Sequence, residues 1–373
     1  MPRTCDRIRP HPGPGRQPPG PVMIGSRQGW EGRTRRGCPV VTGTGPRTPL
    51  TRDALAPLAR TALGAGRRLD AVTRLRGGSK KGVYRLTCDD GSTAVAYVWS
   101  PDEDYWSESP ADPRDPFSHA SGLDLFTASH DRLAALGVRT PRLLLADHTH
   151  RHLPADTAIV EDIPGGSLEE LLRRDPRAGA ATLQELAAAL AALRARTAPG
   201  FGKVAVVDRG GAAHGASCAE AVRDRALWDV EEAAAREPRI AAVRGRLADR
   251  VRALAEEVGP RTGHGLVHGE LGPDHVLVDA DGRPALIDIE GLMYFDAEWE
   301  HVFLQLRFGP HYDALRTEGL DEDRLRLYRL AMHLSLVAGP LRLLDGDFPE
   351  PGAMRAIADY NTGRTLSLLT DAS

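Results

Sequence analysis

The chain has 373 residues, 41% of them hydrophobic and 27% charged, which is ordinary for a globular protein. A formal net charge of -3 argues against a protein built around nucleic-acid phosphates, and the sequence has no apolar run of the roughly 20 residues that span a bilayer. The N-terminus also lacks the apolar stretch of a secretory signal, so we expect a cytoplasmic protein. The four cysteines form no C-x-x-C pair, which indicates neither a zinc site nor a disulfide framework.

Residues 1–50 form a Pro-, Gly- and Arg-rich arm. They contain nine Arg, ten Pro and nine Gly and show no hydrophobic period, so they cannot bury enough apolar surface to offset the entropy of ordering. We predict a disordered segment. A basic arm for an acidic partner is one interpretation, and we favour a flexible tail or a start codon placed too far upstream.

Residues 51–163 predict a small antiparallel sheet with two helices. Turn residues such as Asp89-Asp90-Gly91 separate short runs rich in β-branched and aromatic residues. Strands are expected at residues 69–75, 83–88, 93–99, 143–146 and 157–162, and helices at 51–63 and 120–136.

Residues 164–373 predict a larger, mostly helical domain, because apolar residues recur there at spacings of three and four. Helices are expected at residues 167–174, 182–196, 216–236, 240–258, 320–344 and 350–369, interrupted by one hairpin. The chain is therefore predicted to be an α+β protein of two lobes with a cleft between them, and the join falls at residues 161–166.

The most informative segment is residues 268–291. Two apolar runs, 276–279 and 285–289, flank an Asp-Gly turn and predict a β-hairpin that brings Glu270 back toward Asp288. Two carboxylates at the mouth of a hairpin suit one base for a hydroxyl and one ligand for a cation that bridges phosphates. The alternative is that these acids only end a surface hairpin.

The motif His268-Gly269-Glu270-Leu271, with His275, is followed at the right spacing by Ile287-Asp288-Ile289-Glu290. Together these residues resemble the aminoglycoside phosphotransferase and choline-kinase-like family, the small-molecule branch of the protein-kinase-like fold. The resemblance covers roughly residues 66–345. It implies a sheet lobe, a helical lobe and transfer of a phosphoryl group from ATP or GTP to a hydroxyl. No D-F-G or A-P-E signature follows Asp288, so a protein kinase is a weaker interpretation.

The resemblance assigns roles to this motif. Glu270 is the candidate base, Asp288 is the candidate Mg²⁺ ligand, and His268 belongs to the catalytic turn, which we expect it to pack. Glu290 would hold water near the metal or face the acceptor.

Two positions of the motif depart from the family pattern. Glu270 replaces the usual Asp, which lengthens the side chain by one methylene and keeps the carboxylate. His275 replaces the usual Asn as the second metal ligand, and imidazole suits softer metals better than Mg²⁺. Asp274 could supply the missing oxygen, or His275 could bond a phosphate instead.

The family's third strand carries a lysine for the α- and β-phosphates, but residues 93–99 have none, and Tyr97 is expected in its place. The loop Gly77-Gly78-Ser79-Lys80-Lys81 could compensate with backbone N–H groups and with two of the chain's three lysines. A solvated hairpin tip would have the same sequence. Asp124, the nearest match to the acid that pairs with that lysine, would pair with a loop lysine or be solvated.

Residues 158–163 resemble the family's hinge, where the backbone from Glu161 to Ile163 would bond an adenine or guanine edge between Val95 and Leu277. An ordinary linker strand would have the same pattern. After the motif, Glu298 and Glu300 could attract a cationic acceptor, but we favour a helix packed into the core around Trp299.

We therefore predict a Mg²⁺-dependent phosphotransferase that moves the γ-phosphate of ATP or GTP to a hydroxyl of a small molecule, with amino sugars and amine-bearing alcohols as candidates. The alternative is a catalytically degraded kinase-like module that binds a nucleotide or metabolite without turnover. The missing strand lysine and His275 favour the module, whereas Glu270 and Asp288 favour the enzyme. The sequence implies no nucleic-acid, membrane or protein partner.

Overall fold

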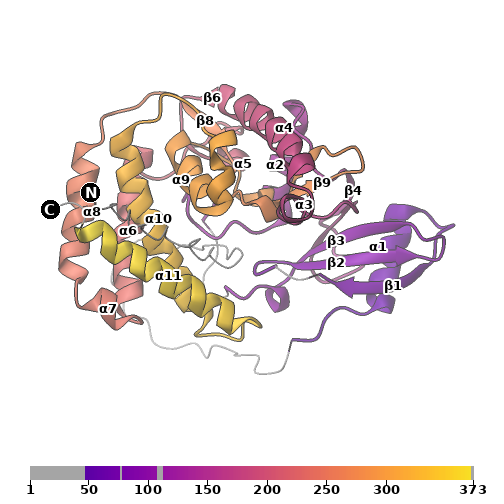
Figure 1. Cartoon of the computed structure of the whole chain (residues 1–373). Helices are drawn as coiled ribbons and strands as arrows, with labels where there is room; N and C mark the ends of the chain where they lie inside the picture. The colour runs from indigo at the N-terminus through magenta and orange to yellow at the C-terminus, as the bar shows by residue number, and fades with distance from the viewer. Residues whose placement is uncertain (1–46, 76–77, 107–111, 371–373) are drawn as a thin grey trace, which may run out of the picture.

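The computed structural model describes residues 47–75, 78–106 and 112–370, with a sheet-rich part at one end and a helical part at the other (Figure 1). The arm predicted at residues 1–50 falls almost wholly outside the described residues, and so does Gly77.

The sheet-rich part contains a five-stranded antiparallel sheet in the order β1-β2-β3-β5-β4. Its strands are β1 (Leu69–Arg74), β2 (Gly82–Cys88), β3 (Thr93–Trp99), β4 (Leu143–Asp147) and β5 (Asp156–Glu161). All five predicted strands are confirmed within one residue at each end, because sharp turns bound each of them.

Two helices lie against this sheet. Helix α1 (Arg52–Leu63) begins after Thr51, whose side chain accepts a hydrogen bond from Ala54 N, and its Leu55 and Leu58 are buried with Tyr84 of the sheet. Helix α2 (Leu123–Ala135) places Phe126 in a second core with Tyr97. It begins three residues later than predicted, after Gly122, whose φ of 122° is outside the helical region.

The helical part contains most of the predicted helices. They are α3 (Leu168–Arg174), α4 (Pro176–Ala195), α5 (Val204–Val207), α6 (Cys218–Ala234), α7 (Pro238–Ala241), α8 (Arg244–Glu257), α9 (Ala297–Phe308), α10 (Glu322–Leu343) and α11 (Pro351–Thr370). Helix α4 begins six residues earlier than predicted, since Asp175 caps it and Pro176 takes its first position. The helix predicted at 240–258 is two helices, α7 and α8.

A small sheet in the helical part was not predicted. Its order is β6-β8-β11-β7, and its strands are β6 (Thr197–Ala198), β7 (Gly202–Lys203), β8 (His264–Val267) and β11 (Met293–Phe295). The predicted hairpin is present as β9 (Val276–Val278) and β10 (Pro284–Leu286). The small sheet positions the site, because β8 runs into the His268 motif and β11 follows Asp288.

The largest hydrophobic core lies among α6, α8, α10 and α11. In the part of the chain that the structure describes, no helix combines the length and the hydropathy that a membrane crossing requires.

Candidate active site

The hairpin positions Asp288 directly after β10. Pro284 pairs with Val278 and Leu286 with Val276, so the residues that follow β10 return to the start of β9. Asp288 has φ 61° and ψ 44°, a left-handed conformation that costs a non-glycine residue free energy and is concentrated at functional sites.

The turn after β8 carries His268 and Glu270. Gly269 between them has a φ of 87°, which favours glycine. His268 Nε2 donates a hydrogen bond to Ile287 O over 3.0 Å. Burial, with His275 nearby, lowers the pKa of His268 to about 4. A neutral, buried imidazole bonded to the hairpin backbone fits the expected packing role.

His275 connects the turn to the hairpin. Its Nδ1 donates to Glu270 O over 2.8 Å, so in the neutral ring Nε2 is an acceptor. That nitrogen lies 3.8 Å from Asp288 Oδ2 and 3.9 Å from Asp274 Oδ2. Asp274 Oδ1 accepts from Arg307 over 2.7 Å, so Oδ2 is the oxygen that Asp274 directs toward His275.

Glu300 of α9 forms a hydrogen bond with the backbone of the catalytic turn. Its Oε2 accepts a hydrogen bond from Gly269 N over 2.6 Å, and the nearby backbone of His268 also favours the charged carboxylate. Burial raises the pKa of Glu300 to about 7, although the backbone of Gly269 and His268 acts in the opposite direction. The sequence prediction gave this residue a structural role in the core but not this contact, because no local pattern relates a helix position to a turn 31 residues earlier.

Lys81 brings a positive charge from the five-stranded sheet to the end of the hairpin. Its Nζ donates to Asp288 Oδ1 over 2.9 Å and forms a second ion pair with Glu290 Oε1. Burial opposes the charge, but Asp288 and Glu290 outweigh it and raise the pKa of Lys81. In turn, despite its own burial, Asp288 has a lowered pKa because of Lys81 and then His275.

Tyr97 is on β3 where the family resemblance places a lysine. Its ring is buried, and Lys81 Nζ lies 5.1 Å from the ring centroid. Because Gly82 pairs with Val98 and Val83 with Tyr97, Lys81 lies at the end of the strand next to Tyr97. The charge is thus supplied from the neighbouring strand.

Lys80 is only 3% exposed, and no side chain in the described ranges forms a hydrogen bond or an ion pair with its ammonium group. Its charge contributes to the lowered pKa of Asp288, which places it near the same site. Ser79 already has two hydrogen bonds within the protein: its Oγ accepts from Trp106 Nε1, and its carbonyl oxygen accepts from Tyr105 N. A Cβ at Gly78 would lie 2.3 Å from Lys81 O, so this tight loop requires glycine.

The predicted hinge follows β5. Glu161 N donates to Arg142 O, and its side chain bonds Arg142 N, so a base edge would have to use the carbonyl of Glu161 and the backbone that follows. Ile163 is buried. Asp124 is 75% exposed at its side chain and lies 3.7 Å from His148, which agrees with the solvated alternative and not with a pair to a loop lysine.

Lys203 is a buried lysine that the sequence did not mark as functional. Its Nζ donates to Asp115 O, Ser118 O and Ser118 Oγ at 2.6–3.1 Å. Burial lowers the pKa of Lys203 to about 7, although Asp115 and Glu270 act in the opposite direction. Lys203 therefore holds the loop around Ser118 next to the catalytic turn.

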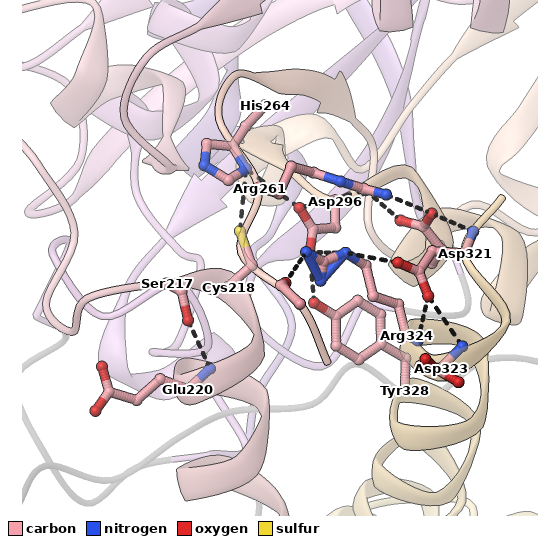
Figure 2. A network of polar contacts seen from close by, with 12 residues as sticks. Ser217, Cys218, Glu220, Arg261, His264, Asp296, Asp321, Asp323, Arg324 and Tyr328 are labelled. Atoms are coloured by element: carbon pink, nitrogen blue, oxygen red, sulfur yellow. Dashed lines mark hydrogen bonds and ion pairs between the residues drawn. The ribbon is translucent and has the colours of Figure 1, made fainter. Parts of the chain in front are cut away.

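A second polar cluster surrounds Asp296 at the start of α9 (Figure 2). Cys218, His264 and Asp296 are close enough to bind a metal ion together. However, Asp296 already accepts from Tyr328 OH over 2.6 Å and lies 3.5 Å from Arg324 Nε. Burial raises the pKa of the Cys218 thiol, which keeps it protonated, whereas a metal ligand is a thiolate. The cluster is a structural network.

The fold and the site define a protein-kinase-like small-molecule phosphotransferase. A family model confirms the class: the chain matches the phosphotransferase enzyme family over residues 71–333 and belongs to that family. No curated protein sequence matches it significantly.

Solved structures show the same fold at low identity. Aminoglycoside phosphotransferase APH(4)-Ia is 17% identical with a TM-score of 0.56, and 87% of this chain and 100% of that chain are covered. Spectinomycin phosphotransferase APH(9)-Ia, with ADP and spectinomycin, is 11% identical with a TM-score of 0.57 over 86% and 99%. Choline kinase LicA from Streptococcus pneumoniae is 12% identical with a TM-score of 0.54 over 86% and 98%.

Proposed function

We propose that the protein transfers the γ-phosphoryl group of ATP or GTP to a hydroxyl of a small molecule. The observation that carries the proposal is the contact of Lys81 with Asp288 and Glu290, which joins the β1–β2 loop to the end of the hairpin. Phosphoryl transfer requires positive charge for the phosphates, a carboxylate for a cation and a base for the nucleophile. Lys81 and Asp288 are candidates for the first two, and the turn that carries Glu270 offers the third.

The two loop lysines are proposed to bind the phosphates. Lys80 is buried without an ion-pair partner among the described residues, and a buried charge needs an anion to offset its desolvation. Lys81 would replace the absent strand lysine. Solved structures of this fold have been obtained with AMP-PNP or ADP bound, which supports a nucleotide as the source of that anion.

Asp288 and His275 are the proposed cation ligands. Oδ2 of Asp288 and Nε2 of His275 face each other at 3.8 Å, and one carboxylate with water and phosphate oxygens is a common Mg²⁺ environment. Mg²⁺ would bridge the phosphates and offset their charge. The imidazole is the poorer part of this fit, because nitrogen ligands favour softer divalent metals.

Glu270 is the proposed base. Its carboxylate would orient the acceptor hydroxyl and accept the proton as the oxygen attacks the γ-phosphorus and the bond to the β–γ bridging oxygen breaks. Glu300 is proposed to act through the backbone, because its hydrogen bond with Gly269 N positions the residue directly before Glu270.

The nucleotide base is proposed to lie at the hinge, between Val95 and Leu277, with hydrogen bonds to the backbone from Glu161 to Ile163. The division into a sheet lobe at residues 51–163 and a helical lobe at 164–373 is part of this proposal. Donor identity, ATP or GTP, is set by those backbone groups.

The second candidate is a binding module without turnover. Tyr97 in place of the strand lysine favours it, and so does the Lys81 ammonium on Asp288, because it competes with a cation for the same carboxylate.

Nucleotide consumption separates the two candidates. The protein would be incubated with Mg²⁺ and ATP or GTP and with hydroxylated acids, amines and polyols. We expect acceptor-dependent consumption that falls at least ~100-fold in Glu270→Ala, in line with general-base contributions. Nucleotide binding without consumption across the panel would favour the module, and turnover unaffected by both Glu270→Ala and Asp288→Ala would refute the assigned site.

A further inference from the structure

A cavity of about 950 Å³ opens on the helical part, beside the catalytic turn. Helices α3, α9, α10 and α11 contribute to its wall, and Pro273 of the turn before β9 lines it as well. A cavity of this volume is large enough for a small organic ligand.

Four arginines from four different helices line this cavity: Arg173 of α3, Arg307 of α9, Arg329 of α10 and Arg364 of α11. His311 and His333 add two imidazoles. Glu169 is the single acid among the described lining residues. The wall is therefore strongly basic in a chain whose net charge is -3.

Most of this charge is not neutralised within the protein. In the described ranges, Arg173, Arg329 and Arg364 form no ion pair with a carboxylate. The buried ring of His333 bonds Asn361, and burial lowers its pKa to about 4, with Arg364 and Arg329 acting in the same direction and Asn361 in the opposite one. Arg173 and Arg364 are exposed and Arg329 is half-buried, so their charges are accessible to an anion that enters the cavity.

The cavity also has an apolar wall. Leu172, Leu306, Met332 and Leu368 line it together with Tyr360, whose side chain is unusually exposed for a large aromatic residue. A ligand that matches the whole cavity would combine an acidic group with an apolar body.

Arg307 links the cavity to the catalytic turn. It lines the cavity and donates to Asp274 over 2.7 Å, and Asp274 precedes His275. A molecule in the cavity therefore lies next to the turn that carries Glu270.

We propose that this cavity binds the acceptor and that the acceptor is an anionic hydroxyl compound, carrying a carboxylate or a phosphate group. This inference rests on the proposed phosphotransferase function and narrows its substrate class. It differs from the amine-bearing acceptors expected from the sequence, because three arginines without a carboxylate partner among the described residues would repel an ammonium group.

Binding is tested first, without nucleotide, using probes that share a ring and differ in charge: phenyl phosphate, benzoate, benzyl alcohol and benzylamine. Calorimetric titration of the full chain should show binding of the two anions that weakens with added salt, and much weaker binding of the amine. Arg364→Glu and Arg329→Gln should each weaken phenyl phosphate binding about 10-fold or more, as expected for loss of a charge-assisted hydrogen bond.

Arg355→Glu is the matched control. Arg355 is an exposed arginine on the same helix as Arg364 and does not line the cavity, so its substitution should change binding less than about twofold. Equal or tighter binding of benzylamine would overturn the proposal, and so would anion binding that all three variants leave unchanged. Thermal unfolding of each variant verifies that it is folded.

Nucleotide consumption then separates this proposal from the function on which it rests. Glycerate and glycerol phosphate should stimulate consumption, ethanolamine and glucosamine should not, and Arg364→Glu should raise KM for the acids with little change in kcat. Turnover with the amines alone would overturn the anionic acceptor and leave the phosphotransferase intact. Specific anion binding with no turnover for any compound would support the cavity and refute the enzyme.

Discussion

The positive charge that the family carries on the third strand is supplied here by Lys81, directly before the neighbouring strand, while Tyr97 occupies the position on β3. The ammonium group of Lys81 lies over the Tyr97 ring and reaches Asp288, so the strand next to β3 supplies what β3 lacks. Lys81 can reach Asp288 because it directly precedes β2, and the register that places Val83 opposite Tyr97 sets the position of Lys81 beside that ring.

Replacing Lys81 should therefore affect nucleotide binding and turnover more than any other change in the loop. We expect Lys81→Met to lower kcat/KM for the nucleotide at least ~100-fold and to destabilise the fold by about 3–5 kcal/mol, because Asp288 and Glu290 lose the buried charge between them. Steady-state kinetics and thermal unfolding measure the two effects.

The double variant Lys81→Met with Tyr97→Lys is the informative control. A lysine at position 97 would take the place of the ring that lies beside the Lys81 ammonium group. The double variant should therefore have a kcat/KM at least ~10-fold higher than that of Lys81→Met alone. If the single variant keeps the wild-type KM for nucleotide, Lys81 has only a structural role.

His275 sets the expected metal preference. Replacing it with Asn exchanges an imidazole nitrogen for an amide oxygen, which a hard cation prefers. In His275→Asn we expect the half-saturating Mg²⁺ concentration to fall several-fold and the ratio of Mn²⁺- to Mg²⁺-supported activity to fall as well. Metal titrations of activity test this, and a higher Mg²⁺ requirement in the variant would show that Nε2 helps to hold the cation.

Helix α9 anchors the catalytic turn through one carboxyl group. Glu300 accepts the buried N–H of Gly269, so Glu300→Ala leaves this donor unsatisfied at a cost of about 1–3 kcal/mol. Glu300→Gln keeps an acceptor oxygen. We expect the Ala variant to lose kcat and the Gln variant to retain most of it, because only the former frees the backbone before Glu270.

Glu300 also predicts a pH dependence. Burial raises its folded-state pKa to about 7 from 4.5, so between these values the folded protein binds more protons than the unfolded chain, and stability falls as pH rises. The loss amounts to about 3 kcal/mol by pH 7. Urea unfolding at several pH values should show this decline in the wild type and a flatter profile in Glu300→Gln. Parallel profiles would show that Glu300 does not titrate in this range.

At the scale of elements, the local sequence predicted the strands and helices correctly where a turn or a cap has characteristic residues. The hairpin around Asp281-Gly282 and all strands of the five-stranded sheet follow from period and turn chemistry. The sheet of β6, β7, β8 and β11 did not, because its strands have only two to four residues and their partners are distant in the sequence.

At the scale of the whole molecule, the motif around Glu270 and Asp288 predicted the family and, through that resemblance, the α+β fold. It could not predict which helices surround the acceptor cavity. Arg173 and Arg364 are 191 residues apart in the sequence, and only the tertiary fold brings both to the wall of one cavity.

The network around Asp296 holds the helical part together across four segments (Figure 2). It connects Cys218 at the start of α6, Arg261 before β8, His264 at the start of β8, and Arg324 and Tyr328 of α10. Although burial opposes it, His264, Tyr328 and Arg324 lower the pKa of Asp296, so the carboxylate is charged and offsets the arginines.

Removing this carboxylate should destabilise the molecule without any involvement of metal. We expect Asp296→Ala to lower the free energy of unfolding by about 3–5 kcal/mol, because it leaves Arg324, whose side chain is only 3% exposed, without its buried partner. Asp323→Ala is the matched control on α10: its ion pair with Arg326 is at the surface and contributes less than about 1 kcal/mol. EDTA should leave the Tm of the wild type unchanged. A fall in Tm with EDTA that Asp296→Ala abolishes would instead identify Cys218, His264 and Asp296 as a metal site.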